Sequence, residues 1–473
     1  MWLDPLRLRL LPLMTRRNFY YEYRQMVLWS VLAGAIEGRF PAVVAANTFA
    51  GSPLQIAVAT STQTAAMITS LLWGMLCIGR PKVRLLMLFC GATALLVGGL
   101  GAVPNDPRFV WWFLAQMAAA QVMLAAVITI RTAVWKSNYP RSDRGRITAR
   151  LQAARTVTGV TTTLLAGALC DHYPSFYRLF FPAIALSGML SIAALSRLRI
   201  RGEKSELKRR GVTQAREVGQ GPMVEPFSIT ALLSPGRILA QVVRIFRDDA
   251  RFRWYIVAQL LVGLSNLMTL PIAVVLITQY LPAMGRGQPG GSGGAAAEGD
   301  FWLSTVLTVG LMQLTLLLTL SHWGRLFDRV GVIRMRVVNC GCWAVSTVAG
   351  LAGNLMILTY SGTNAWWPTW AVVVFAFWAV TQGLALGGGA LAWNLGHLHF
   401  AHPRDAEVYM GIHVSLTGLR GLIGGVLGIR LWEWMGWSAW LVGLAFALGS
   451  LAMFAWMAGR ERAGGGPDAA SGC

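Results

Sequence analysis

Residues 83–103 read VRLLMLFCGATALLVGGLGAV, and this stretch decides the fold class. A helix needs about 20 mostly apolar residues to cross the hydrocarbon core of a bilayer, and the one charged residue here, Arg84, lies next to the start. Stretches of the same kind recur on both sides of it, and we predict twelve spans: 26–48, 54–78, 83–103, 109–134, 147–170, 176–196, 254–283, 301–323, 335–360, 366–394, 407–429 and 437–459. The sequence therefore predicts an all-α polytopic membrane protein.

The composition excludes a water-soluble enzyme. Of the 473 residues, 55% are hydrophobic and 13% are charged, whereas soluble globular proteins carry about 25% charged residues. The formal net charge of +21 would suggest nucleic acid binding if Lys and Arg covered a soluble surface. Their placement between the spans gives another explanation, and no nucleic acid partner is expected. The six cysteines lie mostly in apolar stretches, so a disulfide framework is not expected either.

Lys and Arg are unequally divided between the two ends of the predicted spans. Most of the 41 Lys and Arg fall in the N-terminal segment, the even-numbered connections and the C-terminal segment. The positive-inside rule therefore places both termini in the cytoplasm, and we expect a bacterial inner membrane. The expected organisation is a cytoplasmic segment 1–25 (with Met14 as an alternative start), a six-helix bundle 26–196, a basic linker 197–253 with a surface helix, a second bundle 254–459, and a disordered tail 460–473.

The two halves of the chain align with each other. The matched pairs are Arg24 with Arg253, Gly34 with Gly263, Glu37 with Asn266, Trp73 with Trp323, Trp135 with Trp393, Arg155 with Arg420, and Gly159 with Gly424. The offset between partners only increases along the chain, and its largest jump falls at the Gly-rich insertion 285–299. This pattern indicates a duplicated unit of six spans, and therefore two pseudo-symmetric six-helix bundles.

The connection between the eighth and ninth spans carries a motif, GRLFDRVGVIR at residues 324–334. Its glycines allow a tight turn between helices, and its aspartate can cap a helix or pair with a neighbouring Arg. We expect its arginines, together with Arg336, to hold the loop at anionic lipid headgroups. The residues predicted to form a conformational latch are Gly324, Asp328, Arg329, Gly331 and Arg334.

With this motif, twelve spans, cytoplasmic termini and a long basic linker, the chain resembles the major facilitator superfamily of secondary transporters. The family has a Gly-x-x-x-Asp-Arg-x-Gly loop at this place. The resemblance implies alternating access by a rocker-switch movement of two bundles around a site near the bilayer midplane. The corresponding first-half loop departs from the family pattern because Ile78 stands where the family has Asp.

Ionisable residues inside spans are costly and therefore mark candidate functional sites. Glu37 and Arg39 lie in the first span, but residues two apart on a helix point about 200° from each other. One of them should face a central cavity while the other bonds within its own half, and an ion pair with another span is the structural alternative for each.

Arg155 and Arg420 occupy equivalent positions in the two halves, and Arg suits bidentate recognition of carboxylate or phosphate. The excess of central positive charge predicts an anionic or zwitterionic solute. The alternative is that each Arg pairs with backbone carbonyls or with a loop acid, for which the candidates are Asp171, Glu407 and Glu433.

The other candidates for solute binding or coupling are Asn266, Gln382, Trp393, Asn394 and His413. Interhelical hydrogen bonding is the alternative role for each of them. His413 is a candidate for proton coupling, as Glu37 is, because His titrates near neutral pH. Gly387–Gly389 in the tenth span predicts either a broken helix or close helix packing.

The sequence as a whole predicts a monomeric secondary active transporter for a small solute, with protons as the candidate coupling ion. A non-transporting membrane scaffold or sensor on the same fold is the alternative. We expect no enzyme and no cofactor, because the chain has no paired catalytic carboxylates, nucleophile elbow or nucleotide-binding Gly-rich loop. The three histidines of the tenth connection, His397, His399 and His402, are not expected to bind a metal.

Overall fold

The structure is a computed structural model that describes residues 13–37, 39–77, 80–203, 243–288, 300–400 and 406–463. All regular secondary structure in these ranges is helical, because a helix satisfies its own backbone polar groups in hydrocarbon. The chain divides into two compact units. Unit 1 comprises Met1–Gly38, Ala66–Asn105 and Trp111–Leu239, and unit 2 comprises Arg39–Ala65, Asp106–Val110 and Ala240–Cys473.

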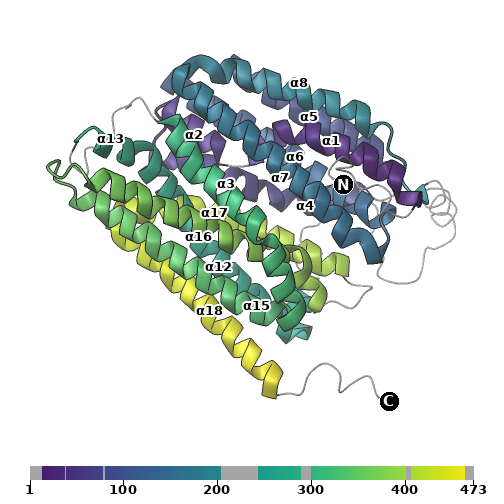
Figure 1. Cartoon of the computed structure of the whole chain (residues 1–473). Coiled ribbons are helices and arrows are strands. Elements are labelled where there is room, and N and C mark those ends of the chain that lie inside the picture. The colour runs from purple at the N-terminus through teal and green to yellow at the C-terminus, as the bar shows by residue number, and fades with distance from the viewer. Residues whose placement is uncertain are drawn as a thin grey trace, which may run out of the picture. The chain divides into compact units, whose positions relative to one another are not determined.

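Unit 1 is built on helix α1, which packs against α7 and α8, while α5 packs against α8 (Figure 1). Its helices are α1 (Leu13–Glu37), α4 (Ser70–Leu76), α5 (Lys82–Gly99), α6 (Val110–Asn138), α7 (Arg141–His172) and α8 (Tyr177–Leu195), with 3-10 turns η2 (Met67–Thr69), η3 (Leu100–Ala102) and η5 (Pro174–Phe176). The backbones of α1 and α7 meet at two glycines, since a Cβ built on Gly159 would lie 2.8 Å from Cα of Gly34.

Unit 2 is built on helix α12, which packs against α17 and α18, and on α15, which packs against α16 and α18 (Figure 1). Its helices are α2 (Phe40–Asn47), α3 (Pro53–Ala66), α12 (Ala250–Val275), α13 (Leu281–Gly285), α14 (Phe301–Thr305), α15 (Leu311–Thr359), α16 (Trp367–Leu395), α17 (Ala406–Met435) and α18 (Ala439–Ala463). Shorter turns are η4 (Pro107–Phe109), η8 (Gly396–His399) and η9 (Gly436–Ser438), and η6 (Leu276–Tyr280) and η7 (Val306–Gly310) are π-helical.

Two of the helix starts in unit 2 show capping side chains clearly. Asp249 accepts a hydrogen bond from the backbone N of Phe252 (2.9 Å) at the start of α12. At the start of α3, the backbone N of Ser52 donates to Oε1 of Gln55 (2.7 Å), and the Ser52 hydroxyl accepts from the backbone N of Gln55 (3.4 Å). Such a capping box satisfies two of the backbone N–H groups that a helix start leaves without partners.

Each of the twelve predicted segments overlaps at least one described helix. By length and composition, seven described stretches qualify as membrane spans, or eight if α1 and α2 together form one. Two of them, Phe301–Thr359 with 59 residues and Ile412–Arg462 with 51, are about 75–90 Å long at 1.5 Å per residue. Since the hydrocarbon core is about 30 Å thick, each is long enough to cross twice. The polytopic helical fold is therefore confirmed, and the number twelve stays a prediction.

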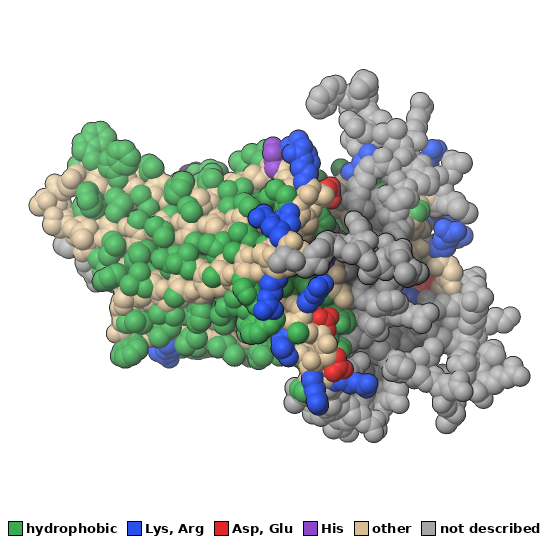
Figure 2. All heavy atoms as spheres, turned by 90° about the horizontal axis from the view of Figure 1, so that it is seen from below, with side chains coloured by type: hydrophobic (Ala, Val, Ile, Leu, Met, Phe, Trp, Pro, Cys, Tyr) green, Lys and Arg blue, Asp and Glu red, His purple; other side chains and the backbone are tan. Residues whose placement is uncertain are grey.

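The described surface is apolar over most of its length, as a lipid-facing surface must be. Leu95 and Leu179 on unit 1 are 69% exposed, and Trp434 on unit 2 is 81% exposed. Figure 2 shows hydrophobic side chains over most of the described surface in view and most of the Lys and Arg side chains gathered in a band at one end. This arrangement suits a protein whose basic end lies at one face of a bilayer.

Three expectations from the sequence need correction or restriction. The three glycines Gly387–Gly389 do not break a helix, because α16 runs without interruption to Leu395. A side chain on Gly387 or Gly388 would instead overlap Trp323, so close packing explains these two, whereas Gly389 has open space beside it. In the linker, residues 243–248 are helical, but most of the predicted surface helix lies outside the described residues. The predicted disordered tail 460–473 is wrong at its start, because α18 continues to Ala463, and residues 464–473 lie outside the described residues.

The contact of Gly34 with Gly159 gives a first prediction. Gly34→Ala should lower the stability of the protein by about 1–3 kcal/mol, because the new methyl group overlaps the backbone of α7. Thermal unfolding in detergent measures the change. Gly91→Ala on α5 is the matched control, since its Cβ would lie 3.7 Å from Ile192 and alanine favours a helix over glycine. Equal melting temperatures for the two variants would contradict the close crossing of α1 and α7.

Candidate functional site

Unit 1 holds an ion pair inside its helices. Glu37 is the last residue of α1, and its carboxylate bonds the guanidinium of Arg155 on α7. The two side chains are 10% and 26% exposed. Arg155 also donates from Nη1 to Oε1 of Gln152 (3.1 Å). The Gly34–Gly159 contact lies about one turn from both residues, so the close approach of the two backbones brings the charges within reach of each other.

The equivalent helices of unit 2 place the second arginine differently. Arg420 on α17 donates from Nη1 to the backbone O of Gln259 on α12 (2.7 Å). Its guanidinium lies against Gly263, where any side chain would overlap it. Asn266 stands at the position of Glu37 and brings no negative charge; its Oδ1 is buried and has no hydrogen-bond partner among the described residues. Arg420 therefore has a carbonyl where Arg155 has a carboxylate.

A second arginine of unit 2 is buried next to this position. Arg336 on α15 is 2% exposed, and it bonds Oε1 of Gln259 and Oδ1 of Asn339 with its two Nη atoms. Its guanidinium also lies over the ring of Phe454, 5.3 Å from the ring centroid. Gln259 therefore joins the two arginines, through its side chain to Arg336 and through its carbonyl to Arg420.

The same network reaches helix α16. Asn339 donates from Nδ2 to the backbone O of Ala385 (2.7 Å). Gln259 donates to the hydroxyl of Tyr255 (2.8 Å), which donates to the backbone O of Ala392 (3.2 Å). Buried polar groups need partners of this kind because they have lost water. Two carbonyls of α16, on either side of its three glycines, are thus fixed to α12 and α15.

Neither Arg336 nor Arg420 contacts an acidic side chain in the part of the chain that the structure describes. The acidic side chains of unit 2 have other roles: Asp106 bonds Arg108, Asp249 and Asp300 cap helices, Asp248 pairs with Arg244, Glu433 with Arg430 and Glu461 with His399, and Asp328 is exposed. A third arginine, Arg39 at the start of α2, has a buried Nε without a hydrogen-bond partner in the described ranges. Unit 2 therefore carries buried positive charge that its described residues do not neutralise.

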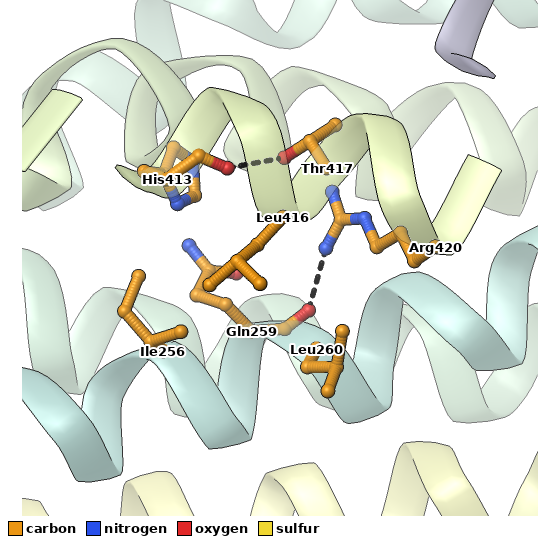
Figure 3. A pocket seen from close by; sticks show the side chains of 7 residues that line it. All are labelled: Ile256, Gln259, Leu260, His413, Leu416, Thr417 and Arg420. Atoms are coloured by element: carbon orange, nitrogen blue, oxygen red, sulfur yellow. Dashed lines mark hydrogen bonds between the residues drawn. The ribbon is translucent and has the colours of Figure 1, made fainter. Parts of the chain in front are cut away.

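A small cavity of about 10 Å³ lies beside Arg420. Figure 3 shows His413, Thr417 and Arg420 of α17 facing Gln259 of α12, and the lining is completed by Ile256, Leu260 and Leu416. The volume is about that needed for one water molecule. His413 is 3% exposed, and its ring lies 6.2 Å from that of Trp393. The cavity is thus a polar pocket bordered by a guanidinium, an imidazole and a hydroxyl.

The structure brings some of the predicted site residues together. Glu37 with Arg155 forms one group, and Arg420 with His413 and Trp393 forms another. Of the two alternatives for the arginines, Arg420 bonds a backbone carbonyl, whereas Arg155 pairs with Glu37 instead of a loop acid. Gln382 is 1% exposed, and its Oε1 has no partner among the described residues. The side chains of Asn394 and Glu407 lie outside the description.

The predicted latch lies within the long helix α15. Gly331 has φ of 76° and ψ of 171° and interrupts the helical geometry, as expected of a turn glycine, whereas Gly324 does not have a positive φ. Asp328 and Arg329 are exposed, and Arg334 is half-buried. The expectation that Arg336 contacts headgroups is wrong, because it is buried against Gln259. The role of the other five residues as a latch stays a prediction.

Sequence reasoning missed Arg336, Gln259 and Tyr255 as members of the site. Arg336 and Gln259 both fall inside predicted spans, which is the signal that could have found them. Within the described residues, no group of three or more His, Cys, Asp or Glu could hold a metal. Of the three histidines considered for one, His399 contacts Glu461 (3.4 Å), and His402 lies outside the described ranges.

The fold and the buried ionisable residues define a polytopic helical transporter. The sequence model of the Major Facilitator Superfamily matches residues 26–412, and the chain belongs to this family. Its members are membrane transporters, not enzymes. No curated protein matches the chain by sequence.

Solved structures of transporters share the fold at low sequence identity. A single-residue mutant of the nucleoside transporter NupG has a TM-score of 0.64 and 12% identity, covering 94% of this chain and 99% of that one. The xylose transporter XylE from E. coli, in a partially occluded inward-open conformation, has a TM-score of 0.58 and 10% identity with the same coverage. A D-xylose-proton symporter has a TM-score of 0.57 and 14% identity, covering 92% and 96%. At these identities the likeness shows the fold alone.

The ion pair of unit 1 gives a second prediction. Arg155→Gln and Glu37→Gln should each cost about 3 kcal/mol, because each leaves the other charge inside the helices without its partner. The double variant should lose less than the sum of the two. Thermal unfolding of the four proteins in detergent measures this coupling, and strictly additive losses would show that the two side chains do not interact.

Proposed function

We propose that this protein is a secondary active transporter that moves a small anionic or zwitterionic solute by rocker-switch alternating access, with protons as the coupling ion. One observation carries the choice of solute. Arg155 has a carboxylate partner in unit 1, whereas the equivalent Arg420 in unit 2 has a backbone carbonyl, and Asn266 is the residue that aligns with Glu37. The solute supplies the missing negative charge.

The physical argument rests on the cost of buried charge. Arg stays protonated in proteins, and a carbonyl dipole offsets less of the desolvation cost than a carboxylate does. Arg336 shares Gln259 with Arg420 and adds a second positive charge. A solute carboxylate or phosphate at Arg420 would take the role that Glu37 has for Arg155 in unit 1. The cavity beside Arg420 is large enough for about one oxygen atom, so it takes a single oxygen of an acidic group and not the whole solute.

Proton coupling is assigned to Glu37. A protonated Glu37 loses the charge that holds Arg155, so protonation and the ion pair exclude each other. His413, at the cavity beside Arg420, is the second candidate because an imidazole titrates near neutral pH. The D-xylose-proton symporter among the solved structures supports proton coupling as an activity of this fold.

The membrane placement is part of the same proposal. The protein works as a monomer in a bacterial inner membrane, with both termini in the cytoplasm and its basic end at anionic headgroups. The gathering of Lys and Arg at one end of the described surface supports this orientation (Figure 2). The domain boundaries at 26–196 and 254–459 are proposed as the two repeats that move.

Variants that change the charge at Arg420 and Asn266 test whether the solute is acidic. In a thermal-shift panel of carboxylates, phosphate esters, amino acids and neutral sugars, solutes with an acidic group should stabilise the wild type. Arg420→Gln should weaken binding about 10–100-fold, since hydrogen bonds to charged groups contribute about 1.5–3 kcal/mol. Asn266→Glu should weaken it similarly by giving Arg420 an internal partner. Arg430→Gln, which removes an exposed arginine paired with Glu433, is the control and should bind normally.

Two results would contradict the assignment to acidic solutes. Stabilisation by a neutral sugar or nucleoside that Arg420→Gln leaves unchanged would place solute recognition elsewhere. Absence of flux for every stabilising solute in proteoliposomes would favour the scaffold or sensor alternative.

Proton coupling has its own test. Glu37→Gln should abolish uptake driven by an inward proton gradient, because the amide cannot exchange a proton, while solute exchange without a gradient continues. Both activities, gradient-driven uptake and exchange without a gradient, are measured in proteoliposomes with a solute identified in the thermal-shift panel. Gradient-driven uptake at the wild-type rate would remove Glu37 from the coupling mechanism and leave His413 as the candidate.

A further inference from the structure

A part of unit 1 that does not include Glu37 or Arg155 brings two arginines together with polar side chains of α1 and α6. A cavity of about 260 Å³ opens there. Its lining is Thr15 and Asn18 from α1, Asn138 and Pro140 at the end of α6, and Arg199, Ile200 and Arg201 after α8. In the same measure one water molecule needs about 10–15 Å³, so the cavity can hold a polyatomic ligand.

The segment that carries the two arginines is fixed in place although it has no regular secondary structure. Asn18 donates from Nδ2 to the backbone O of Arg199 (2.8 Å) and accepts from its backbone N (3.3 Å). Asn138 accepts from the backbone N of Arg201 (3.1 Å), and Glu203 accepts from the backbone N of Lys82 (2.8 Å). These bonds use the backbone of Arg199 and Arg201, so both guanidinium groups are left for another partner.

The lining carries positive charge and a spare donor. It contains no acid, and the acid nearest along the chain, Glu203, is engaged at the start of α5. Arg199 and Arg201 are exposed and have no carboxylate partner in the part of the chain that the structure describes. Asn138 is 4% exposed, and its Nδ2 has no hydrogen-bond partner among the described residues. Two forked guanidinium groups and an amide N–H match the several acceptor oxygens of a phosphate group.

We propose that this cavity binds a phosphate ester group, with Arg199, Arg201 and Asn138 as its donors. The headgroup of an anionic phospholipid is one source, because α8 exposes Leu186 and Leu190 in the half that leads to the segment with the arginines. A soluble phosphate compound is the other source of the same chemistry.

The experiment compares thermal unfolding of the purified protein with short-chain phosphatidylglycerol, with short-chain phosphatidylcholine and with inorganic phosphate. Phosphatidylglycerol at ten times its half-saturating concentration should raise the melting temperature of the wild type by about 2–4 °C more than phosphatidylcholine does. An equal rise with inorganic phosphate assigns the site to soluble phosphate compounds, and a rise with phosphatidylglycerol alone assigns it to a lipid headgroup.

The variant Arg199→Gln/Arg201→Gln should lose this difference while keeping the wild-type melting temperature without ligand, because the backbone bonds of the segment remain. Arg80→Gln/Arg84→Gln removes two exposed arginines of unit 1 outside the cavity and is the control for general attraction between charges. The proposal is overturned if the two double variants respond alike, or if neither phosphatidylglycerol nor inorganic phosphate stabilises the wild type beyond phosphatidylcholine.

Discussion

A guanidinium group enclosed by membrane helices needs a partner, and this constraint organises the interior of both units. The side chain keeps its proton under all ordinary conditions, so it cannot avoid the cost of desolvation by becoming neutral. Coulombic interactions are strong in an environment of low dielectric constant, and the loss of water is costly there. Unit 1 meets the requirement with the carboxylate of Glu37. Unit 2 meets it only in part, with the carbonyl and the side-chain amide of Gln259.

The difference between the units arises from few residues on a shared plan. In both, the arginine projects from one helix toward the helix that starts the half, and a glycine of that helix lies at the crossing. Gly34 meets the backbone of α7, whereas Gly263 meets the guanidinium of Arg420 itself. Glu37 in one half becomes Asn266 in the other. The arginine thus has a carboxylate partner in unit 1 and a backbone carbonyl as its partner in unit 2.

The polytopic helical fold could be predicted from the sequence because apolarity over about 20 residues is a local property. The candidate arginines could also be predicted, since charge within such a stretch is visible in the sequence. Their partners could not. Glu37 reaches Arg155 through a crossing of two glycines, and spacing along one helix does not reveal which helix crosses it.

Arg336 shows the same limit at a span boundary. Its place next to the predicted loop suggested the membrane surface. The turn is at Gly331, however, so Arg336 lies more than one helical turn beyond it and is buried between helices beside Gln259. The three glycines of α16 were ambiguous for a related reason. A glycine permits both a bend and a close contact, and only the position of Trp323 shows that the contact is the reason here.

The boundary between the two units falls between two charged residues, Glu37 and Arg39. Glu37 belongs to unit 1 and Arg39 belongs to unit 2, with Gly38 between them in the sequence. The chain passes between the units again at Ala65 and Ala66, immediately before the 3-10 turn η2 (Met67–Thr69). Helix geometry is interrupted at both places, since α1 ends at Glu37 and α2 starts at Phe40, and interrupted helices bend at lower cost than continuous ones. The carboxylate of the ion pair in unit 1 is therefore separated by a single residue, Gly38, from an arginine that belongs to unit 2.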